Sequence, residues 1–488
     1  MACMDRSISA RRVATLVDGF DRCPAYAGLA DALVLLIGDG RIAAGARLPS
    51  ERELTEALRV SRTTVTRAYA AVRDSGYAEA RRGSGTYTRV PGGPSRAHDR
   101  ALLPGQDDRD AIDLNCAAPF APPQIATAYA EAATMLPAYL GGHGYFPAGL
   151  PELQAAIAAL YDARGLPTDP AQVMVTPGAL SGVSIVAQAL TGRGDRVLVD
   201  VPGYPNAAER LRSAGARLVT TEVDPDGWDL DATAARLRQV TPRLAYLIPD
   251  FHNPTGLLMS DEERERYAAD LRRGHVTPIV DESHVMLALE GQELPRPFAA
   301  HAPDAVTVGS TSKGFWGGLR VGWVRAPLGL MEQLTRARVT LDLGVPVMEQ
   351  LAVLRLLTDH EPILREHRAH LREQRDALVA GLGAALPGWR FRVPAGGLSL
   401  WCELPGPGGG PGRGLGIALA EEAERHGVII APGPVFAPDG GLDRFVRVPY
   451  TRRVEELDRA VARIAAAWEV VTARQAPASR SAGRVMVA

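Results

Sequence analysis

The feature that most constrains the fold is an alternation of short β-branched runs with helical segments between residues 172 and 308. The runs cover residues 172–176, 196–199, 217–220, 244–248, 278–280 and 305–308. Runs separated by helices are typical of a largely parallel sheet that is covered by helices. Ligand sites in such sheets lie at the carboxyl ends of the strands. We therefore predict an α/β fold whose site residues follow these runs.

Composition excludes several classes of protein. With 488 residues, 46% of them hydrophobic, the chain can form two or three domains with substantial cores. The formal net charge is −2, so a surface that binds nucleic acid must be local. We find no run of the roughly 18 apolar residues that a membrane span needs, and no signal-peptide pattern. The cysteines have neither zinc-site nor disulfide-framework spacing. We expect a cytoplasmic protein without a metal site or membrane contact.

Residues whose groups could bind a ligand follow four of the runs. A glycine turn that opens a helix, and so predicts an anion site, follows the first run. An aromatic residue follows the second, an amide the fourth and a carboxylate the fifth. Taken singly, strand-terminal Asp and Asn residues often only cap turns, and the tyrosine could belong to the core. The residues are Gly178, Ala179 and Leu180, then Tyr204, Asn253 and Asp281.

Lys313 is the only lysine in a chain with 54 lysines and arginines together. Arginine stays protonated and cannot supply the free amine that condenses with an aldehyde. A bias against lysine codons would also leave few lysines, so the neighbouring residues decide between the two explanations. Ser310, Ser312, a run of glycines and Arg320 surround this lysine. We predict that Lys313 is a Schiff-base lysine.

Residues 23–90 have the pattern of a small DNA-binding domain. An apolar helix over residues 27–37 precedes a helix capped by Ser50 and a helix capped by Ser61, and a hairpin follows. The third helix has an apolar face of Val65, Ala68, Tyr69 and Val72. Residues 61–90 hold six arginines and two acids, a local net charge of +4. Helix, turn, helix and hairpin predict a winged helix-turn-helix; a docking domain with solvated arginines is the alternative.

This segment resembles the GntR-type DNA-binding domain in the motifs Leu48-Pro49-Ser50-Glu51-Arg52, Val60-Ser61-Arg62-Thr63-Thr64-Val65 and Gly83-Ser84-Gly85-Thr86-Tyr87. The resemblance implies that double-stranded DNA is a partner, with Arg62 facing a base edge and the hairpin tip along the backbone or minor groove. The DNA-contacting residues that it implies are Arg52, Ser61, Arg62, Thr63, Thr64, Arg67, Arg81, Arg82, Gly83, Ser84 and Gly85.

The predicted domain organisation has five parts. A loose, partly helical arm covers residues 1–22, and the winged helix-turn-helix covers residues 23–90. A linker rich in Pro, Gly and charge covers residues 91–112, the main domain residues 113–474, and a disordered tail residues 475–488. Twenty extended residues reach about 65 Å at most. The linker is therefore long enough for the DNA-binding domain to sit on a partner subunit, in a domain-swapped dimer.

The order of Tyr204, Asn253, Asp281, Lys313 and Arg320 resembles the fold type I, aspartate-aminotransferase-like family of pyridoxal phosphate proteins over residues 113–474. The resemblance implies that Lys313 binds pyridoxal 5'-phosphate as an aldimine and that Asp281 keeps the ring nitrogen protonated. It places Asn253 at the phenolic oxygen and Tyr204 on the ring face. The phosphate ligands that it implies are Gly178, Ala179, Leu180, Ser310 and Arg320, and Ser312 is a further cofactor-binding residue.

Two further roles come from the same resemblance. Tyr145 matches a tyrosine that reaches the phosphate of the neighbouring subunit, which implies a homodimer. Arg447 matches the arginine that binds a substrate α-carboxylate with both nitrogens.

The chain departs from this family at two places. His284 stands where family members usually have a tyrosine that tunes the cofactor, and it either replaces that tyrosine or only caps the strand. Ala179 and Leu180 also lack the side-chain donors that many relatives offer to the phosphate. Both departures put efficient turnover in doubt more than cofactor binding.

A GntR-type head joined to an aminotransferase-like body resembles the MocR-type regulators over nearly the whole chain. We therefore expect a pyridoxal phosphate-dependent transcription regulator that binds an operator and senses a small amine or amino acid through an aldimine. One alternative is a working aminotransferase with an appended DNA-binding domain. Another is a regulator whose body is only a vestigial dimerisation scaffold.

Overall fold

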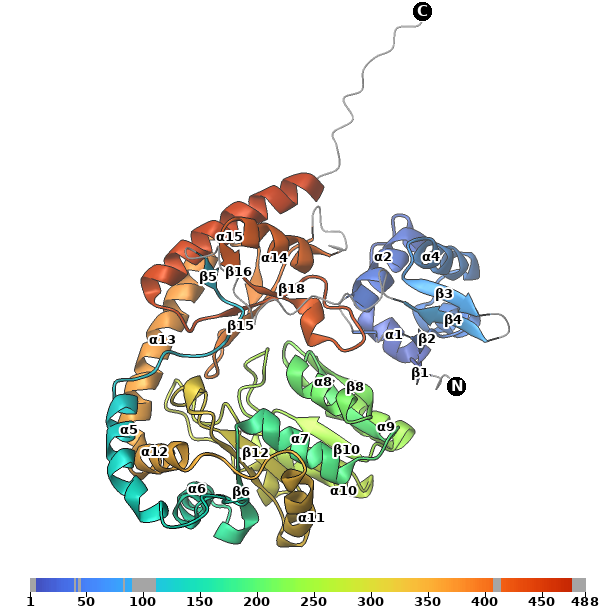
Figure 1. The fold of residues 1–488 in the computed structure, drawn as a ribbon. Helices are drawn as coiled ribbons and strands as arrows, with labels where there is room; N and C mark the ends of the chain where they lie inside the picture. The colour runs from blue at the N-terminus through green and yellow to red at the C-terminus, as the bar shows by residue number, and fades with distance from the viewer. Residues whose placement is uncertain are drawn as a thin grey trace, which may run out of the picture.

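The computed structural model describes residues 6–38, 41–42, 45–81, 84–89, 111–406 and 414–475. It shows an N-terminal head, a large unit built on an eight-stranded sheet, and a small C-terminal unit built on a four-stranded sheet (Figure 1). Within these described ranges, no helix is long and apolar enough to cross a membrane.

The head confirms the predicted winged helix-turn-helix. Its helices are α1 (Ala10–Leu16), α2 (Ala25–Gly38), α3 (Glu51–Leu58) and α4 (Arg62–Asp74). Its sheet has the order β1 (Arg6–Ser7), β2 (Ala46–Arg47), β4 (Gly85–Thr88) and β3 (Ala78–Arg81). Ser50 and Ser61 cap α3 and α4 as predicted, and the apolar face of α4 is buried. The head therefore has a core of its own.

The described part of the predicted arm belongs to the head and is not loose. Strand β1 pairs with β2, and Val13 and Val17 are buried in the head core. The helix of this segment has only seven residues, and Val13 is its one buried residue, so the sequence shows little apolar periodicity there. Packing against the rest of the head stabilises it, and sequence periodicity cannot show that packing.

The large unit contains the predicted sheet, and all six predicted runs form strands of it. They are β6 (Val173–Thr176), β7 (Arg196–Val201), β8 (Arg217–Asp224), β10 (Leu244–Leu247), β11 (Thr277–Asp281) and β12 (Val306–Ser310). Two antiparallel strands, β9 (Gly227–Trp228) and β13 (Gly322–Arg325), were not predicted. The order β6-β13-β12-β11-β10-β7-β8-β9 places β13 inside the sheet.

Both faces of this sheet are buried, which explains why its strands have continuous apolar sequences. On β10, Leu244 and Tyr246 face one core and Ala245 and Leu247 face the other. The first core includes α7 (Ala179–Leu190), α8 (Pro205–Ser213) and α11 (Leu328–Val339). The second includes α5 (Gln124–Met135), α6 (Pro151–Ala163), α9 (Leu230–Val240), α10 (Asp261–Arg273) and α12 (Val347–Thr358).

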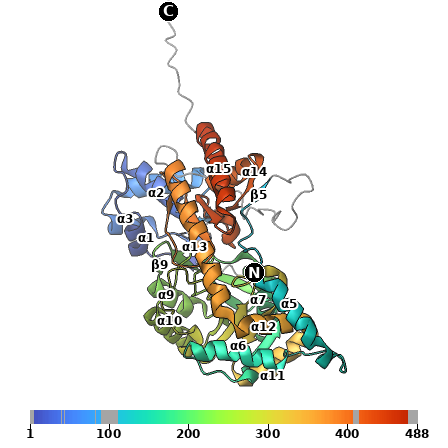
Figure 2. The same cartoon turned by 90° about the vertical axis from the view of Figure 1, so that its left-hand side faces the viewer.

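The small unit packs three helices on an antiparallel sheet. The sheet has the order β14 (Arg390–Phe391), β15 (Ser399–Glu403), β18 (Phe445–Pro449) and β17 (Ala431–Pro432). The helices are α13 (His360–Ala385), α14 (Leu415–Arg425) and α15 (Val454–Gln475), and α13 extends from the large unit to the small unit (Figure 2).

The boundaries of the predicted linker and tail lie mostly outside the described residues. Strand β5 (Ile112–Asp113) pairs with β16 (Val428–Ile429), so the last residue of the predicted linker already belongs to the small unit. Gln475, the first residue of the predicted tail, ends α15.

Candidate functional site

A cavity of about 1190 Å³ brings together the strand ends of the large unit and part of the small unit. Of the residues predicted to bind cofactor or effector, Tyr145 alone is missing from its lining; its side chain is 58% exposed elsewhere on the surface. No group of three His, Cys, Asp or Glu residues in the described ranges could hold a metal ion. The predicted residues that line the cavity are Gly178, Ala179, Leu180, Tyr204, Asn253, Asp281, His284, Ser310, Ser312, Lys313, Arg320 and Arg447.

Lys313 follows β12 and presents its amine to the cavity. The Nζ atom donates a hydrogen bond to the backbone oxygen of Ala117 at 2.6 Å. Burial lowers the pKa of the Lys313 amine, and the guanidinium of Arg447 adds to this effect. A lowered pKa makes more of the neutral amine available, and the neutral amine is the form that attacks an aldehyde.

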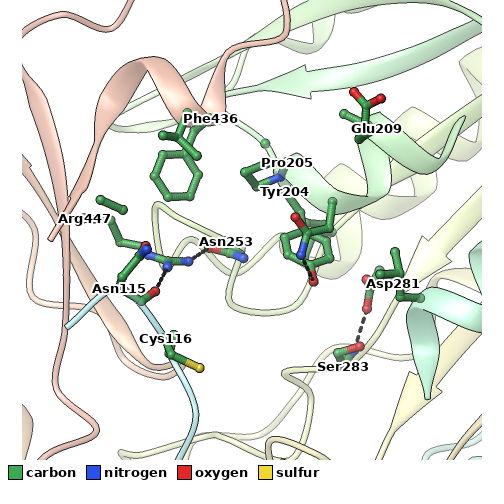
Figure 3. Close-up of a pocket in the computed structure, with 18 of the residues that line it drawn as sticks. Asn115, Cys116, Tyr204, Pro205, Glu209, Asn253, Asp281, Ser283, Phe436 and Arg447 are labelled. Atoms are coloured by element: carbon green, nitrogen blue, oxygen red, sulfur yellow. Dashed lines mark hydrogen bonds between the residues drawn. The ribbon is translucent and has the colours of Figure 1, made fainter. Parts of the chain in front are cut away.

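Asp281 ends β11 and is held by two donors. Its Oδ2 accepts a hydrogen bond from the Tyr246 hydroxyl at 2.6 Å. Its Oδ1 accepts one from the backbone N–H of Ser283 at 2.9 Å (Figure 3). Burial, with the nearby Asp281 carboxylate, raises the pKa of Tyr246 well above its usual range, so this hydroxyl remains a donor. Each carboxylate oxygen can still accept a further hydrogen bond, such as one from a protonated ring nitrogen.

Tyr246 is a site residue that sequence reasoning missed. It lies on β10 opposite Ile279 of β11, and it lines the cavity. The available signal was a hydroxyl within an otherwise apolar strand. Its hydrogen-bond partner, Asp281, lies on the neighbouring strand β11, and the sequence does not show that β10 and β11 are neighbours.

The start of α7, where the glycine turn predicts an anion site, lies at the cavity. Gly178 has a φ of +93°, and a Cβ atom there would lie 3.0 Å from Nη2 of Arg320. The guanidinium of Arg320 donates a hydrogen bond to the backbone oxygen of Pro177 at 2.9 Å, which holds it beside the turn. Backbone amides at a helix start, together with an arginine, suit a phosphate group.

The hydroxyls predicted for this anion site lie on the neighbouring strand end. Ser310 and Ser312 both line the cavity, and Oγ of Ser310 accepts a hydrogen bond from the Ser312 N–H at 3.1 Å.

Arg447 enters the cavity from β18 of the small unit. It donates hydrogen bonds to Oδ1 of Asn253 at 3.2 Å and to the backbone oxygen of Asn115, and its guanidinium lies 4.9 Å from the ring centre of Phe436 (Figure 3). Burial lowers the pKa of Arg447 to about 10. Its buried Nε has no hydrogen-bond partner among the described residues. A carboxylate ligand would supply that acceptor.

His284 lines the cavity. Its Nδ1 lies 3.0 Å from the backbone oxygen of Phe251. Burial, followed by the charge of Lys313, lowers the pKa of His284 to about 3, so the ring is neutral at ordinary pH. Because a carbonyl only accepts, the proton of the neutral ring lies on Nδ1.

Residues 115–117 are the second part of the site that was not predicted. The oxygen of Asn115 accepts from Arg447, and the oxygen of Ala117 accepts from Lys313. The exposed thiol of Cys116 lies between these two carbonyls in sequence and lines the cavity. The acceptors are backbone oxygens, which every residue has, and no predicted strand precedes this segment. The sequence therefore did not indicate that residues 115–117 belong to the site.

The first turn of α4 forms the centre of the predicted DNA surface. The Ser61 hydroxyl accepts from the Thr64 N–H at 3.0 Å and lies 2.8 Å from the Thr64 hydroxyl, so both side chains stabilise the helix start. Thr63 is exposed. The Arg62 side chain is 79% exposed, with Nε 3.8 Å from Glu51. Arg62 is therefore free to reach a base edge after leaving a weak surface ion pair.

The other predicted DNA residues differ in how strongly the head holds them. The Arg52 side chain is 87% exposed. The guanidinium of Arg67 lies 3.7 Å from the ring centre of Tyr26, and that of Arg81 lies 4.3 Å from the ring centre of Tyr87. Gly85 is the first residue of β4 and Ser84 lies in the turn before it, whereas Arg82 and Gly83 lie outside the described residues.

Comparison with known proteins identifies both parts of the chain. Residues 25–88 match the family described as bacterial regulatory proteins, gntR family, and residues 122–464 match aminotransferase class I and II. A DNA-binding head joined to an enzyme-like body defines a class of transcription regulators. The chain belongs to the aminotransferase class I and II family, in the two-domain organisation of the MocR-type regulators.

Individual relatives agree with this assignment. The chain is 29% identical to the uncharacterized HTH-type transcriptional regulator YdcR of Escherichia coli, over 86% of this chain and 94% of the relative. It is 30% identical to the probable rhizopine catabolism regulatory protein MocR of Rhizobium meliloti, over 61% of this chain and 64% of the relative. The crystal structure of LysN, an α-aminoadipate aminotransferase from Thermus thermophilus, superposes with a TM-score of 0.67 at 28% identity, covering 75% of this chain and 93% of LysN.

Replacing Arg62 with alanine tests the DNA surface. If Arg62 contacts a base edge, the variant should lose roughly 1–3 kcal/mol of binding free energy on a specific operator and much less on random DNA. Titration of both DNAs at one salt concentration measures this, and Arg73→Ala, at the far end of α4, is the matched control. Equal losses on the two DNAs would show that Arg62 contacts phosphate instead.

Proposed function

We propose that this regulator binds pyridoxal 5'-phosphate at Lys313 and uses the cofactor to sense a small amine or amino acid. One observation carries the proposal: a single cavity combines an amine of lowered pKa, a braced carboxylate, an anion site and a buried arginine with an unpaired nitrogen. The family uses this cofactor, and the same combination suits its aldehyde, ring nitrogen and phosphate.

The residues present fit each part of the cofactor. The amides of Ala179 and Leu180 with Arg320 would hold the phosphate, Asp281 the ring nitrogen, and Asn253 and Tyr204 the phenolic oxygen and the ring face. When bound, the cofactor supplies an aldehyde carbon that condenses with amines and a ring that accepts electrons. The Lys313 amine, whose pKa burial lowers, would hold the cofactor at its aldehyde carbon.

Arg447 would select effectors that carry a carboxylate. Its two terminal nitrogens already contact the Asn253 side chain and the Asn115 oxygen, so its orientation is set before a ligand arrives. An arginine of fixed orientation binds a carboxylate with less entropy loss than a mobile one. We infer that the preferred effector is an amino acid.

The exposed Tyr145 supports a dimer in which this side chain completes the phosphate site of the partner subunit. Two subunits would carry two heads, so the operator should contain two half-sites. We place this regulator in the cytoplasm with the DNA that it binds.

Replacing Lys313 with alanine tests the cofactor assignment. The purified wild type should have a visible absorbance band and retain the cofactor after borohydride reduction, and Lys313→Ala should lose both because no other lysine exists. Absorbance spectra and intact mass before and after reduction measure this. A band that persists in the variant and is fixed by borohydride would overturn the assignment. A wild type without a band would favour the vestigial scaffold.

Replacing Arg447 with alanine tests how the effector is recognised. The variant should bind operator DNA as the wild type does, yet lose the change in operator affinity that an effective standard L-amino acid produces. Arg453→Ala, an exposed position near Arg447, is the matched control. Operator titrations with and without the amino acid measure this. An undiminished response in Arg447→Ala would mean that the ligand has no carboxylate at this position.

A working aminotransferase is the second candidate, because the site residues are complete and the LysN structure is similar. With His284 in place of the usual tyrosine and no side-chain donors from Ala179 or Leu180, we expect conversion of amino acid to keto acid far slower than about 1 per second. Keto-acid production by the cofactor-loaded protein measures this rate. A rate at or above that value would place the enzyme ahead of the sensor.

A further inference from the structure

Two buried carboxylates lie on the loops that carry Asp281 and Asn253, yet neither lines the cavity. Glu282 follows Asp281 at the end of β11, and Asp250 lies three residues before Asn253. The side chains of Glu282 and Asp250 are 2% and 0% exposed. Burying a carboxylate costs free energy unless a charged partner offsets it. The partners of these two carboxylates must therefore lie outside the cavity.

Arg164, at the end of α6, joins the two carboxylates. Its Nη1 donates a hydrogen bond to Oε2 of Glu282 at 3.1 Å, and its Nη2 lies 3.9 Å from Oδ1 of Asp250. The same oxygen of Asp250 accepts a hydrogen bond at 2.9 Å from Nη2 of Arg264, a fully buried residue of α10. Burial raises the pKa of Glu282, and the charge of Arg164 opposes this rise. The Arg164 network, made of Arg164, Glu282, Asp250 and Arg264, thus connects the two loops.

Stability alone does not account for this network. Nε of Arg164, Oε1 of Glu282 and Oδ2 of Asp250 are buried and have no hydrogen-bond partner among the described residues. A buried ionic network that leaves polar atoms unpaired contributes little to stability compared with an apolar core. Its position between two loops of the site points to a role in their geometry.

The loop that carries Asn253 requires support from its surroundings. Phe251, between Asp250 and Asn253, has a φ of +49°, a left-handed conformation that a residue other than glycine keeps only when its surroundings hold it. The backbone oxygen of Phe251 lies 3.0 Å from Nδ1 of His284, which belongs to the other loop. The two loops are therefore joined at two points, by His284 and by the Arg164 network.

The relative position of the two loops sets the spacing between the Asp281 carboxylate and the Asn253 amide. In the view of Figure 3, Tyr204 lies between these two side chains. The proposed cofactor would place its ring nitrogen at Asp281 and its phenolic oxygen at Asn253. Because the ring is rigid, it can contact both groups only at one spacing, and hydrogen bonds weaken steeply away from that geometry.

We propose that Arg164, Glu282 and Asp250 are positioning residues that hold Asp281 and Asn253 at the spacing that the cofactor ring requires. They act through the two loops and do not touch the ligand. This inference rests on the proposed function for the identity of the ligand, whereas the connection between the loops can be measured without any ligand.

Replacing Glu282 with alanine tests the positioning in the full-length protein. Glu282→Ala should raise the apparent Kd for pyridoxal 5'-phosphate about tenfold, the lower end of the loss seen at metal sites when a group that orients a ligand residue is removed. It should also weaken the visible circular dichroism of the cofactor at saturation, because the ring would no longer be held by both groups. Glu282→Gln keeps an oxygen that can accept from Arg164, so it should retain the Kd and the circular dichroism of the wild type.

Arg375→Met is the matched control for the loss of a buried charge pair. The Arg375 side chain is 6% exposed, lies 2.5 Å from Glu290 and does not line the cavity. This variant should keep the cofactor Kd and the circular dichroism of the wild type. If Glu282→Ala does not fold, the double variant Arg164→Met with Glu282→Gln removes both charges of the pair and should show the same two losses.

A second readout needs no cofactor. Backbone amides of residues 250–256 should exchange hydrogen faster in cofactor-free Glu282→Ala than in the wild type or in Arg375→Met, although Glu282 lies on the other loop. Unchanged exchange there, an unchanged Kd and circular dichroism in Glu282→Ala, or equal losses in Arg375→Met would overturn the proposal. If the wild type binds no pyridoxal 5'-phosphate while exchange still rises in Glu282→Ala, the connection between the loops stands and the proposed function fails.

Discussion

The site depends on the placement of two buried cationic side chains, Lys313 and Arg447, in one cavity. Burial lowers the pKa values of both, and the charge of Arg447 lowers that of Lys313 further, so holding them there costs free energy. The backbone oxygens of residues 115 and 117 accept hydrogen bonds from the two side chains and offset part of that cost. Because β5 at residues 112–113 pairs with β16 of the small unit, this brace is held in place by backbone pairing. A ligand with negative groups would offset the rest, which is why we expect the site to bind carboxylate and phosphate.

The two cationic side chains come from the two units that form the cavity. Lys313 belongs to the large unit and Arg447 to the small unit, and α13 extends from one unit to the other (Figure 2). A ligand that binds both side chains would favour one relative position of the two units.

The sequence was sufficient for the parts of this protein that local pattern determines. The six strands were recognisable because strands buried on both faces have short continuous apolar runs. Lys313 was recognisable as a cavity residue because it is the only lysine of the chain, and its role as a Schiff base stays a prediction. Tyr246 and residues 115–117 were missed because their roles come from strand order and from backbone oxygens. Strand β13 was missed because its four residues follow a glycine-rich turn and have no alternation of their own.

His284 shows how one residue can separate binding from turnover. A tyrosine at this position would offer a hydroxyl that donates a hydrogen bond toward the cofactor. The His284 ring is neutral at ordinary pH, because burial lowers its pKa to about 3, and its single proton is engaged by the oxygen of Phe251. Its other nitrogen can therefore only accept, so the ring cannot replace that donor. Catalysis requires groups that stabilise the transition state more than the bound ligand. Retention of the binding residues with loss of this donor therefore agrees with the proposed sensor and predicts slow turnover.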